Sequence, residues 1–219
     1  MISPKNRRLP VPAPPPGGSG TLLLSALYLA PIEYYSHLFH ARKVVVELHE
    51  NYQKQSYRNR CNIVGANGLM PLSIPVEKPS AAECRMKDIR IADHGNWRHL
   101  HWNAIVSAYN STPFFEYYAD ELHPFYEKRI EFLADFNLQL HQLICKWLRI
   151  DTPFELSSEY VAEVTADVND YREAIHPKRP SRFTIRPYYQ VFGRKLGFIQ
   201  NASIIDLLFN MGNEARLWL

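Results

Sequence analysis

The sequence predicts an α/β fold with a mostly parallel sheet, flanking helices and a small β-hairpin. Two buried strands, 21–30 and 43–47, are separated by a short helix, 32–41, and this order indicates a βαβ unit with both strands parallel in one sheet. Two apolar runs joined through Asn67 and Gly68 indicate the hairpin. At 219 residues the chain is long enough to bury one sizeable core.

The first twenty residues differ in composition from the rest of the chain. They contain Lys5, Arg7 and Arg8 and no acid, and then a run of prolines and glycines, a composition that cannot bury a core. We therefore expect residues 1–20 to form a disordered tail and residues 21–219 to form a single domain. The proline tract directly after the basic residues argues against a signal peptide.

Charge and cysteine usage limit the partners and the compartment. The formal net charge is +3, and the tail carries all of it, so we expect neither a nucleic acid nor an anionic membrane as a partner. Cys61, Cys84 and Cys145 form no Cys-x-x-Cys pair, which indicates a reducing compartment. The apolar run 22–32 is shorter than the about 20 residues that a membrane-spanning helix needs. We expect a cytoplasmic protein with no membrane insertion.

The first half of the chain supplies the predicted sheet. Pro31 can open the helix 32–41, and β-branched residues mark the second buried strand. The hairpin strands are expected at 61–64 and 70–76. An alternation of polar and apolar residues predicts another half-buried strand at 87–91.

The second half is predicted to be mainly helical. Apolar stripes at helical spacing predict a helix at 97–108, Pro113 opens one that runs to Tyr118, and a long helix is expected at about 126–148.

Beyond the acidic residues 151–173, the basic, proline-broken stretch 176–186 indicates a surface loop. Aromatic residues predict a short strand at 188–192. Ser203 is expected to cap a last helix, 204–209, that ends near Gly212.

A polar stretch, 49–63, directly follows the second buried strand, and this is where α/β proteins place their ligand sites. It obeys neither the helical nor the strand period. Its Lys54, Arg58 and Arg60 suit a planar or multiply charged oxyanion, because arginine offers two parallel N–H donors and lysine a compact charge. The alternative is an ordinary polar connector between strands.

The histidines do not suggest a metal site. His99 and His101 are two residues apart on a predicted helix and point to different faces. His37 with His40, and His94 with His101, could share a face, but no carboxylates or thiols accompany them to complete a coordination shell. His101 is a lone polar group on a largely apolar helix, which suits either a general base or a core histidine with a hydrogen-bond partner.

The tyrosines allow two interpretations as well. Tyr28, Tyr34, Tyr35, Tyr188 and Tyr189 could stack on a sugar or a nucleobase, or they could belong to the core. Walker and Gly-x-Gly-x-x-Gly motifs are absent from the sequence, so no cofactor is firmly implied, and a nucleotide or nucleotide sugar stays open as a ligand.

Several motifs in this order along the chain together resemble the WbqC-like protein family over about residues 22–217. They are Tyr28-Leu29-x-Pro31-x-x-Tyr34-Tyr35, then Lys54, Ser56, Tyr57 and Arg58-Asn59-Arg60, then Trp97-x-x-x-His101-Trp102, then Tyr109 with Pro113-Phe114. Residues 93–115, 187–192 and 203–206 resemble the branch common in Bacteroides-type bacteria. The chain departs from the family at Leu48-His49, in place of an acidic pair, and at Ile32-Glu33, in place of tryptophan and glycine.

WbqC-like proteins tend to occur among bacterial proteins of surface-polysaccharide biosynthesis, which includes O-antigen and capsule. The resemblance therefore implies a transferase acting on an activated sugar, such as the N-acylation of an amino sugar. The order of strand, aromatic turn, helix, strand and polar loop is also similar to that of nucleotidyltransferase-like Rossmann proteins. The alternative is a non-catalytic sugar- or protein-binding module, because the sequence shows no complete set of nucleophile, base and orienting group. We favour the transferase.

Three segments, 28–35, 53–60 and 188–190, are predicted to meet at one site, because loops that leave the carboxyl ends of adjacent parallel strands converge on one edge. His101 would accept a proton, and Lys54, Arg58 and Arg60 would hold the phosphates of the substrate. The candidate catalytic residues are Lys54, His101 and Tyr34. The candidate substrate- or phosphate-binding residues are Tyr28, Gln53, Ser56, Arg58, Asn59, Arg60, Tyr188, Tyr189 and Gln190.

Overall fold

A parallel sheet organises the chain in the computed structural model, which describes residues 20–78, 84–181 and 183–219. Apart from Gly20, the predicted tail lies outside the described residues. Four strands lie in the order β5-β2-β1-β6, and every neighbouring pair is parallel. They are β1 (Thr21–Ser25), β2 (Lys43–Glu47), β5 (Phe154–Leu156) and β6 (Val168–Asp170). The predicted α/β class with a mostly parallel sheet is confirmed.

The predicted hairpin is also confirmed. Strands β3 (Arg60–Gly65) and β4 (Gly68–Ser73) pair antiparallel, and Gly65 lies opposite Gly68 across the two-residue turn. Gly68 has a φ of 110°, a backbone conformation that is open to glycine and strained for other residues. The glycine therefore allows the tight return of the chain.

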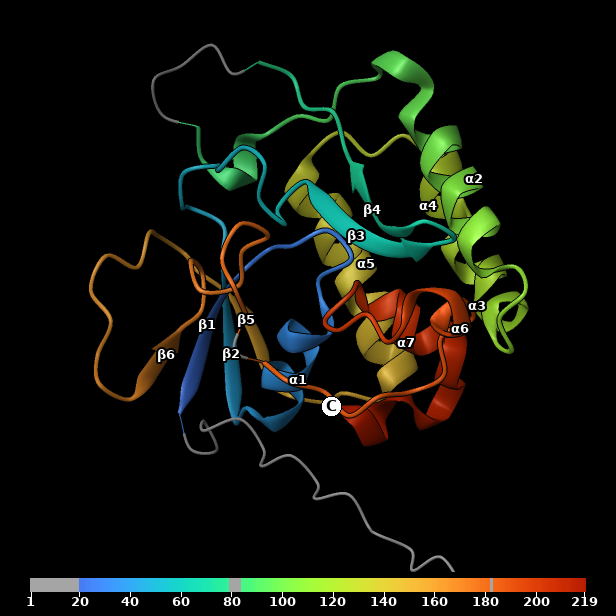
Figure 1. Cartoon of the computed structure of the whole chain (residues 1–219). Helices are drawn as coiled ribbons and strands as arrows, with labels where there is room; N and C mark the ends of the chain where they lie inside the picture. The colour runs from blue at the N-terminus through green and yellow to red at the C-terminus, as the bar shows by residue number, and fades with distance from the viewer. Residues whose placement is uncertain (1–19, 79–83, 182) are drawn as a thin grey trace, which may run out of the picture.

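Helices pack beside the sheet and the hairpin (Figure 1). Figure 1 shows the sheet on the left of the view, with α1 beside it and most other helices gathered on the right. The helices are α1 (Ile32–His40), α2 (Trp97–Tyr109), α3 (Phe115–Leu122), α4 (Pro124–Glu127), α5 (Leu133–Leu148), α6 (Gly193–Leu196) and α7 (Ile204–Met211), with short 3-10 helices η1 (Met86–Asp88), η2 (His94–Asn96) and η3 (Gly212–Trp218). None of the helices in the described part of the chain has the length and apolar character that crossing a membrane requires.

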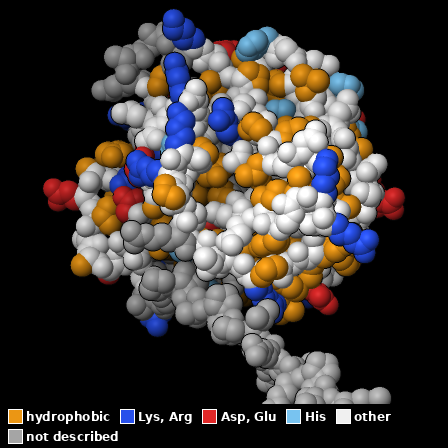
Figure 2. Space-filling model, viewed as in Figure 1, with side chains coloured by type: hydrophobic (Ala, Val, Ile, Leu, Met, Phe, Trp, Pro, Cys, Tyr) orange, Lys and Arg blue, Asp and Glu red, His pale blue; other side chains and the backbone are white. Residues whose placement is uncertain are grey.

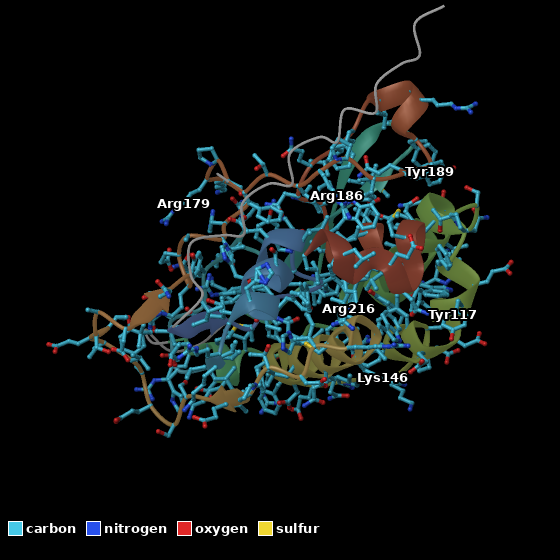
Figure 3. All side chains as sticks on the ribbon, turned by 90° about the horizontal axis from the view of Figure 1, so that it is seen from below. Tyr117, Lys146, Arg179, Arg186, Tyr189 and Arg216 are labelled. Atoms are coloured by element: carbon cyan, nitrogen blue, oxygen red, sulfur yellow. The ribbon has the colours of Figure 1, made fainter. Side chains whose placement is uncertain are left out.

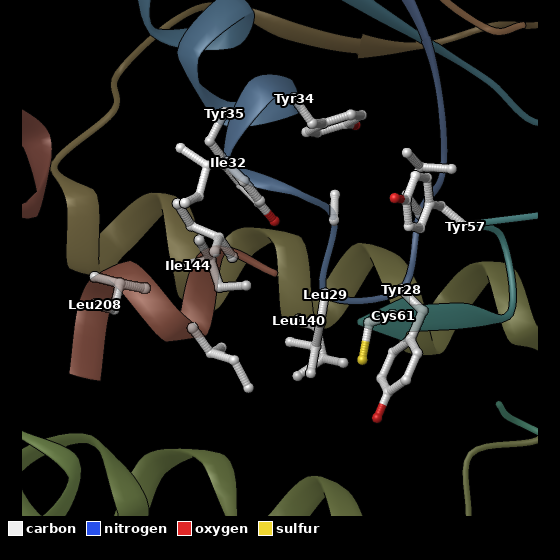
Figure 4. Close-up of a cluster of buried hydrophobic side chains, with 14 of the residues drawn as sticks. Tyr28, Leu29, Ile32, Tyr34, Tyr35, Tyr57, Cys61, Leu140, Ile144 and Leu208 are labelled. Atoms are coloured by element: carbon white, nitrogen blue, oxygen red, sulfur yellow. The ribbon is translucent and has the colours of Figure 1, made fainter. Parts of the chain in front are cut away.

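The main core lies where α1 faces α5 and α7. Figure 4 shows Tyr35 and Ile32 of α1 close to Ile144 of α5 and Leu208 of α7, and all four side chains are buried. Burial of each large apolar side chain stabilises the fold by about 1.5–3 kcal/mol relative to exposure. This packing holds α1, and with it the crossover from β1 to β2, in a fixed position.

Two predicted elements are wrong because their backbones pair with each other. The predicted strand 87–91 contains η1 and isolated bridges, and the predicted helix 126–148 is interrupted between α4 and α5. The N–H of Ile91 donates to the carbonyl of Glu131 at 2.8 Å, and the N–H of Leu133 donates to the carbonyl of Ile89 at 2.9 Å. These hydrogen bonds require extended backbone at 130–132, so one continuous helix cannot form there.

The predicted strand 188–192 is wrong because a side chain takes the place of a strand partner. The amide of Gln190 donates to the carbonyl of Ile199 at 2.9 Å and accepts from its N–H at 2.9 Å. Tyr188 and Gln190 also both turn toward Asp206 of α7. Tyr188 and Gln190 therefore belong to a buried polar cluster, and the aromatic residues of this segment do not mark a strand.

Two boundaries differ in smaller ways. The first strand ends at Ser25 and not at 30, because Tyr28 turns away to donate its N–H to the carbonyl of Tyr57 at 2.9 Å. Ser203 does occupy the N-cap position of α7. Its hydroxyl, however, donates to the carbonyl of Leu29 at 2.7 Å and does not cap the helix, so it ties α7 to the segment after β1.

Candidate functional site

The carboxyl ends of the four parallel strands meet at one edge of the sheet. β1 ends at Ser25 and β2 at Glu47, and these two residues are register partners. β6 ends at Asp170 beside β1, and β5 ends at Leu156 beside β2. The chain adds β2 and β5 on one side of β1 and β6 on the other, so the strand order reverses at β1. In open α/β sheets, ligands bind outside the carboxyl ends of the strands at such a reversal.

A cleft of about 440 Å³ opens at this edge. Its lining comes from the loop after β2, from the loop between β5 and β6, and from the segment after β6, and Arg85 completes it. The lining residues are His49, Glu50, Asn51, Gln53, Arg85, Tyr160, Asp170, Arg172 and Glu173. The cleft is therefore built by the chain segments that the strands deliver to the edge.

Glu47, at the end of β2, connects these segments through a buried carboxylate. It accepts hydrogen bonds from the N–H groups of His49 at 2.8 Å and Val161 at 2.9 Å, and from the hydroxyl of Ser157 at 2.7 Å. The guanidinium of Arg172 lies 3.4 Å away and compensates its charge. One carboxylate thus fixes the loop after β2, the loop between β5 and β6, and the segment after β6.

The guanidinium of Arg172 also orients two groups that face the cleft. Its Nε and Nη2 donate to the carboxylate of Asp170 at 3.0 and 2.7 Å. Burial raises the pKa of Asp170, but the hydrogen bonds from Arg172 outweigh it and hold the pKa below its usual value, so this group is ionised at neutral pH. The ring of Tyr160 lies over the same guanidinium, 5.3 Å from Cζ to the ring centroid, and is 52% exposed.

A second buried ion pair forms the base of the cleft. Arg58 is 1% exposed, and its Nε and Nη2 donate to the carboxylate of Glu50 at 2.8 and 2.5 Å. Nη2 also donates to the hydroxyl of Ser25 at 3.0 Å and lies 3.7 Å from the carboxylate of Glu173. Glu50 therefore occupies the two parallel donors of Arg58. The sequence had led us to expect that Arg58 binds a phosphate of the substrate, but its donors are already taken.

The predicted catalytic residues Tyr34 and His101, together with Tyr28, lie in the core and do not line the cleft. The hydroxyl of Tyr28 is 3.0 Å from Nδ1 of His101 and 2.8 Å from the hydroxyl of Tyr126. The hydroxyl of Tyr34 donates to the carbonyl of Ser25 at 3.2 Å. Burial lowers the pKa of His101 to about 4, so this ring is neutral near pH 7 and serves as a hydrogen-bond partner in the core.

Among the residues predicted in the loop after β2, Gln53 lines the cleft, where its amide donates to the carboxylate of Glu173. The hydroxyl of Ser56 donates to the carbonyl of Gln53 at 2.7 Å and stabilises the turn of the loop. Lys54 is exposed beside Gln53. The structure thus places this part of the loop at the mouth of the cleft.

Asn59 and Arg60, the other two predicted residues of this loop, contact the hairpin. The amide of Asn59 donates to the carbonyl of Ile74 at 2.9 Å, and Nε of Arg60 donates to the hydroxyl of Ser73 at 3.0 Å. Both side chains therefore attach the loop to the end of β4 and the residue directly after it, and neither lines the cleft.

The structure brings the first two predicted segments together and places the third apart. The hydrogen bond from Tyr28 to Tyr57 joins the segment after β1 to the loop after β2. Tyr189, by contrast, is exposed, and Figure 3 shows it across the width of the molecule from Arg179, which pairs with Glu173 of the cleft. Tyr188 and Gln190, bound to Asp206 of α7, belong to this distant region.

The sequence pattern did not reveal Asp170, Arg172, Glu173 and Tyr160 as site residues. The strands β5 and β6 that bring them to the edge are three residues long, too short to show a period of two. His49 belonged to the polar stretch, but it was not singled out. A signal was present, since Glu47 is a charged residue at the end of a buried, β-branched run.

The donor set of the cleft favours an organic polar ligand. Across the described ranges, His, Cys, Asp and Glu side chains do not form groups of three or more that could hold a metal ion. Partly exposed carboxylates, an imidazole, amides and one exposed aromatic ring are groups that bind hydroxyls and ammonium groups and stack on a ring.

Comparisons with known proteins place the chain in a family. Residues 26–176 match the model of the WbqC-like protein family, and this match does not distinguish branches of the family. The chain is 29% identical over 197 residues to the uncharacterized protein Rv1507c of Mycobacterium tuberculosis, which covers 77% of this chain and 83% of the relative. No solved structure is significantly similar to this chain. The chain therefore belongs to the WbqC-like protein family, and this membership suggests a role related to polysaccharide biosynthesis.

Proposed function

We propose that the protein is a cytoplasmic transferase of surface-polysaccharide biosynthesis, which transfers an acyl group to the amine of an activated amino sugar. The observation that carries the proposal is the cleft at the carboxyl edge, which combines the exposed ring of Tyr160 with the partly exposed carboxylates of Asp170 and Glu173. Cys61, Cys84 and Cys145 are free thiols, which supports a reducing compartment.

The ring of Tyr160 is suited to carry a sugar. One face lies over the guanidinium of Arg172, which leaves the other side of the exposed ring for the apolar C–H face of a pyranose. The carboxylates of Asp170 and Glu173 accept hydrogen bonds from sugar hydroxyls and attract an ammonium group. An amino sugar matches this combination better than a neutral sugar does.

His49 is the imidazole that lines the cleft, and it takes the role of general base that the sequence had suggested for His101. In the proposed reaction, the bound ammonium group first loses one proton to solvent, and the resulting neutral amine attacks the carbonyl carbon of an activated acyl donor, a thioester or an acyl phosphate. The C–N bond forms, the bond from carbon to sulfur or phosphate oxygen breaks, and the leaving group departs with the bonding electron pair. The excess proton on nitrogen passes to His49.

Tyr160→Ala tests the sugar site. We expect methyl 2-amino-2-deoxyglucoside to bind the native protein more tightly than methyl glucoside. The substitution should weaken the binding of the amino glycoside about tenfold, because the contact between the two rings is lost. Isothermal titration calorimetry measures both affinities. Tyr117→Ala is the matched control, because Tyr117 is an exposed tyrosine on α3. If Y160A and Y117A bind the amino glycoside with equal affinity, the cleft is not the sugar-binding site.

Turnover separates an enzyme from a binding module. Mass spectrometry of the amino glycoside after incubation with acetyl-coenzyme A, acetyl phosphate or an aminoacyl thioester should show the acylated product. His49→Asn should abolish product and keep sugar affinity within a factor of about two, because a general base contributes typically 10²–10⁴-fold to rate. A native protein that binds the glycoside and acylates it with none of these donors would favour the non-catalytic sugar-binding module.

A further inference from the structure

Three basic residues belong to the two loops that line the cleft, after β2 and after β6, and we call Lys54, Lys178 and Arg179 the basic rim. Nζ of Lys178 donates to the side-chain carbonyl of Gln55 at 2.5 Å, which places the loop after β6 against the loop after β2. Nη2 of Arg179 lies 3.3 Å from the carboxylate of Glu173. All three cations are exposed, and Lys54 directly follows a residue that lines the cleft. The rim is therefore continuous with the cleft.

The rim and the cleft differ in charge. The rim carries three cations, and Glu173, the carboxylate that pairs with Arg179, also faces Arg58. His176 reports the same balance, since burial lowers its pKa and the positive charges of Arg179, Arg58 and Lys178 lower it further than Glu173 raises it. Figure 2 shows Lys and Arg side chains gathered at the upper left of the view, on the side of the molecule beyond the carboxyl ends of the strands.

The charges of the cleft itself are balanced. Glu50 is paired with Arg58 and Asp170 with Arg172, and Glu173 and Arg85 complete the charged lining. A ligand that fills both regions must therefore be anionic at one end and uncharged or cationic at the other. An amino sugar joined to a diphosphate has this division of charge, whereas a free sugar leaves the rim empty and a polyanion would meet the carboxylates of the cleft.

Building on the proposed function, we infer that the basic rim binds the diphosphate of an activated sugar whose ring lies in the cleft. Lysine supplies a compact charge and arginine a planar fork, and both suit phosphate oxygens. The shared chemistry is a sugar diphosphate ester, whose other end is either a nucleoside or a lipid. Because the rim is exposed, its contribution to affinity must decrease with salt.

The full chain is titrated by calorimetry with uridine diphosphate, guanosine diphosphate, inorganic pyrophosphate and farnesyl diphosphate, at low and at high salt. We expect at least one diphosphate ester to bind. The double variant Lys54→Ala/Lys178→Ala should weaken that binding about a hundredfold at low salt, about tenfold for each lost charge-assisted contact. Lys128→Ala/Lys195→Ala is the matched control, since both lysines are exposed and neither lines the cleft. Preference for the nucleotides or for the farnesyl ester identifies the source of the diphosphate.

The inference is overturned if the rim variant binds the preferred diphosphate as tightly as the control variant, or if the native protein binds none of the four probes. Titration with methyl 2-amino-2-deoxyglucoside, which has no phosphate, keeps this failure separate from a failure of the proposed function. That glycoside should bind the rim variant and the native protein equally. If Tyr160→Ala leaves glycoside binding intact while the rim variant loses diphosphate binding, the basic rim is confirmed as the diphosphate site and the assignment of the sugar site to Tyr160 is wrong.

Discussion

Arg58 carries a full positive charge in a buried position, and Glu50 compensates that charge through two hydrogen bonds. Arg58→Met should lower the free energy of unfolding by about 3–5 kcal/mol, because it leaves the carboxylate of Glu50 buried and unpaired. Urea denaturation at pH 7 measures the change. Arg60→Met is the control, since the guanidinium of Arg60 donates to the hydroxyl of Ser73 near the surface.

The double variant Glu50→Gln/Arg58→Met completes this test. It should recover part of the lost stability, because no buried charge stays unpaired. If R58M instead folds as stably as the native protein, the ion pair does not fix the base of the cleft. The same experiment distinguishes the two roles of Arg58, because a residue that only bound ligand would change affinity and leave unfolding unaltered.

At the scale of elements, one amide group connects the two ends of the segment 188–199. Gln190 pairs with the backbone of Ile199 on one side and donates to Asp206 of α7 at 2.8 Å on the other. Gln190→Ala should destabilise the protein by about 1–3 kcal/mol, because it leaves these buried groups without their partner. Hydrogen exchange of the Ile199 amide should become faster.

Gln200→Ala provides the control for this segment, since Gln200 is exposed close to Ile199. Its effect on stability should stay within about 0.5 kcal/mol. Unchanged exchange of the Ile199 amide in Q190A would mean that backbone contacts, and not the amide, hold the segment.

At the scale of the whole molecule, the sequence predicts what is local and misses what depends on distant partners. The βαβ unit follows from apolar and β-branched runs, and the hairpin from Asn67-Gly68, because these signals lie within a few residues. β5 and β6 become strands through pairing with β2 and β1, and their own three residues carry no period.

The candidate site follows the same rule. The polar loop at the edge of the sheet was predictable, because it directly follows a buried strand, and the structure places Gln53 of this loop in the cleft. The burial of Arg58 was not predictable from the sequence, because it depends on Ser25 and on the backbone of Arg172, which are far away in the sequence. A basic residue in a polar stretch can equally well be a ligand donor or half of a buried ion pair until its neighbours in space are known.

Buried titratable groups make the stability of the whole molecule depend on pH. Burial lowers the pKa of His37, His101 and His141 to about 4 each. The unfolded chain binds these protons at about pH 6.5, so it holds more protons than the native state between pH 6.5 and 4, and stability falls as the pH falls through this window. His101 and His141 each cost about 3 kcal/mol at pH 4 on this basis.

Asp206 opposes the three histidines, because burial raises its pKa to about 6 and the native state therefore binds its proton first on acidification. The three histidines together outweigh Asp206, so the protein still loses stability as the pH falls toward 4. Urea denaturation at pH 7, 6, 5 and 4 should show a shallower loss for His101→Gln, whose amide does not titrate and can still bond the Tyr28 hydroxyl, and a steeper loss for Asp206→Asn. His99→Gln should follow the native curve, since His99 is exposed on the same helix. If H101Q loses stability as steeply as H99Q between pH 6.5 and 4, the burial of a neutral His101 is not a source of the acid sensitivity.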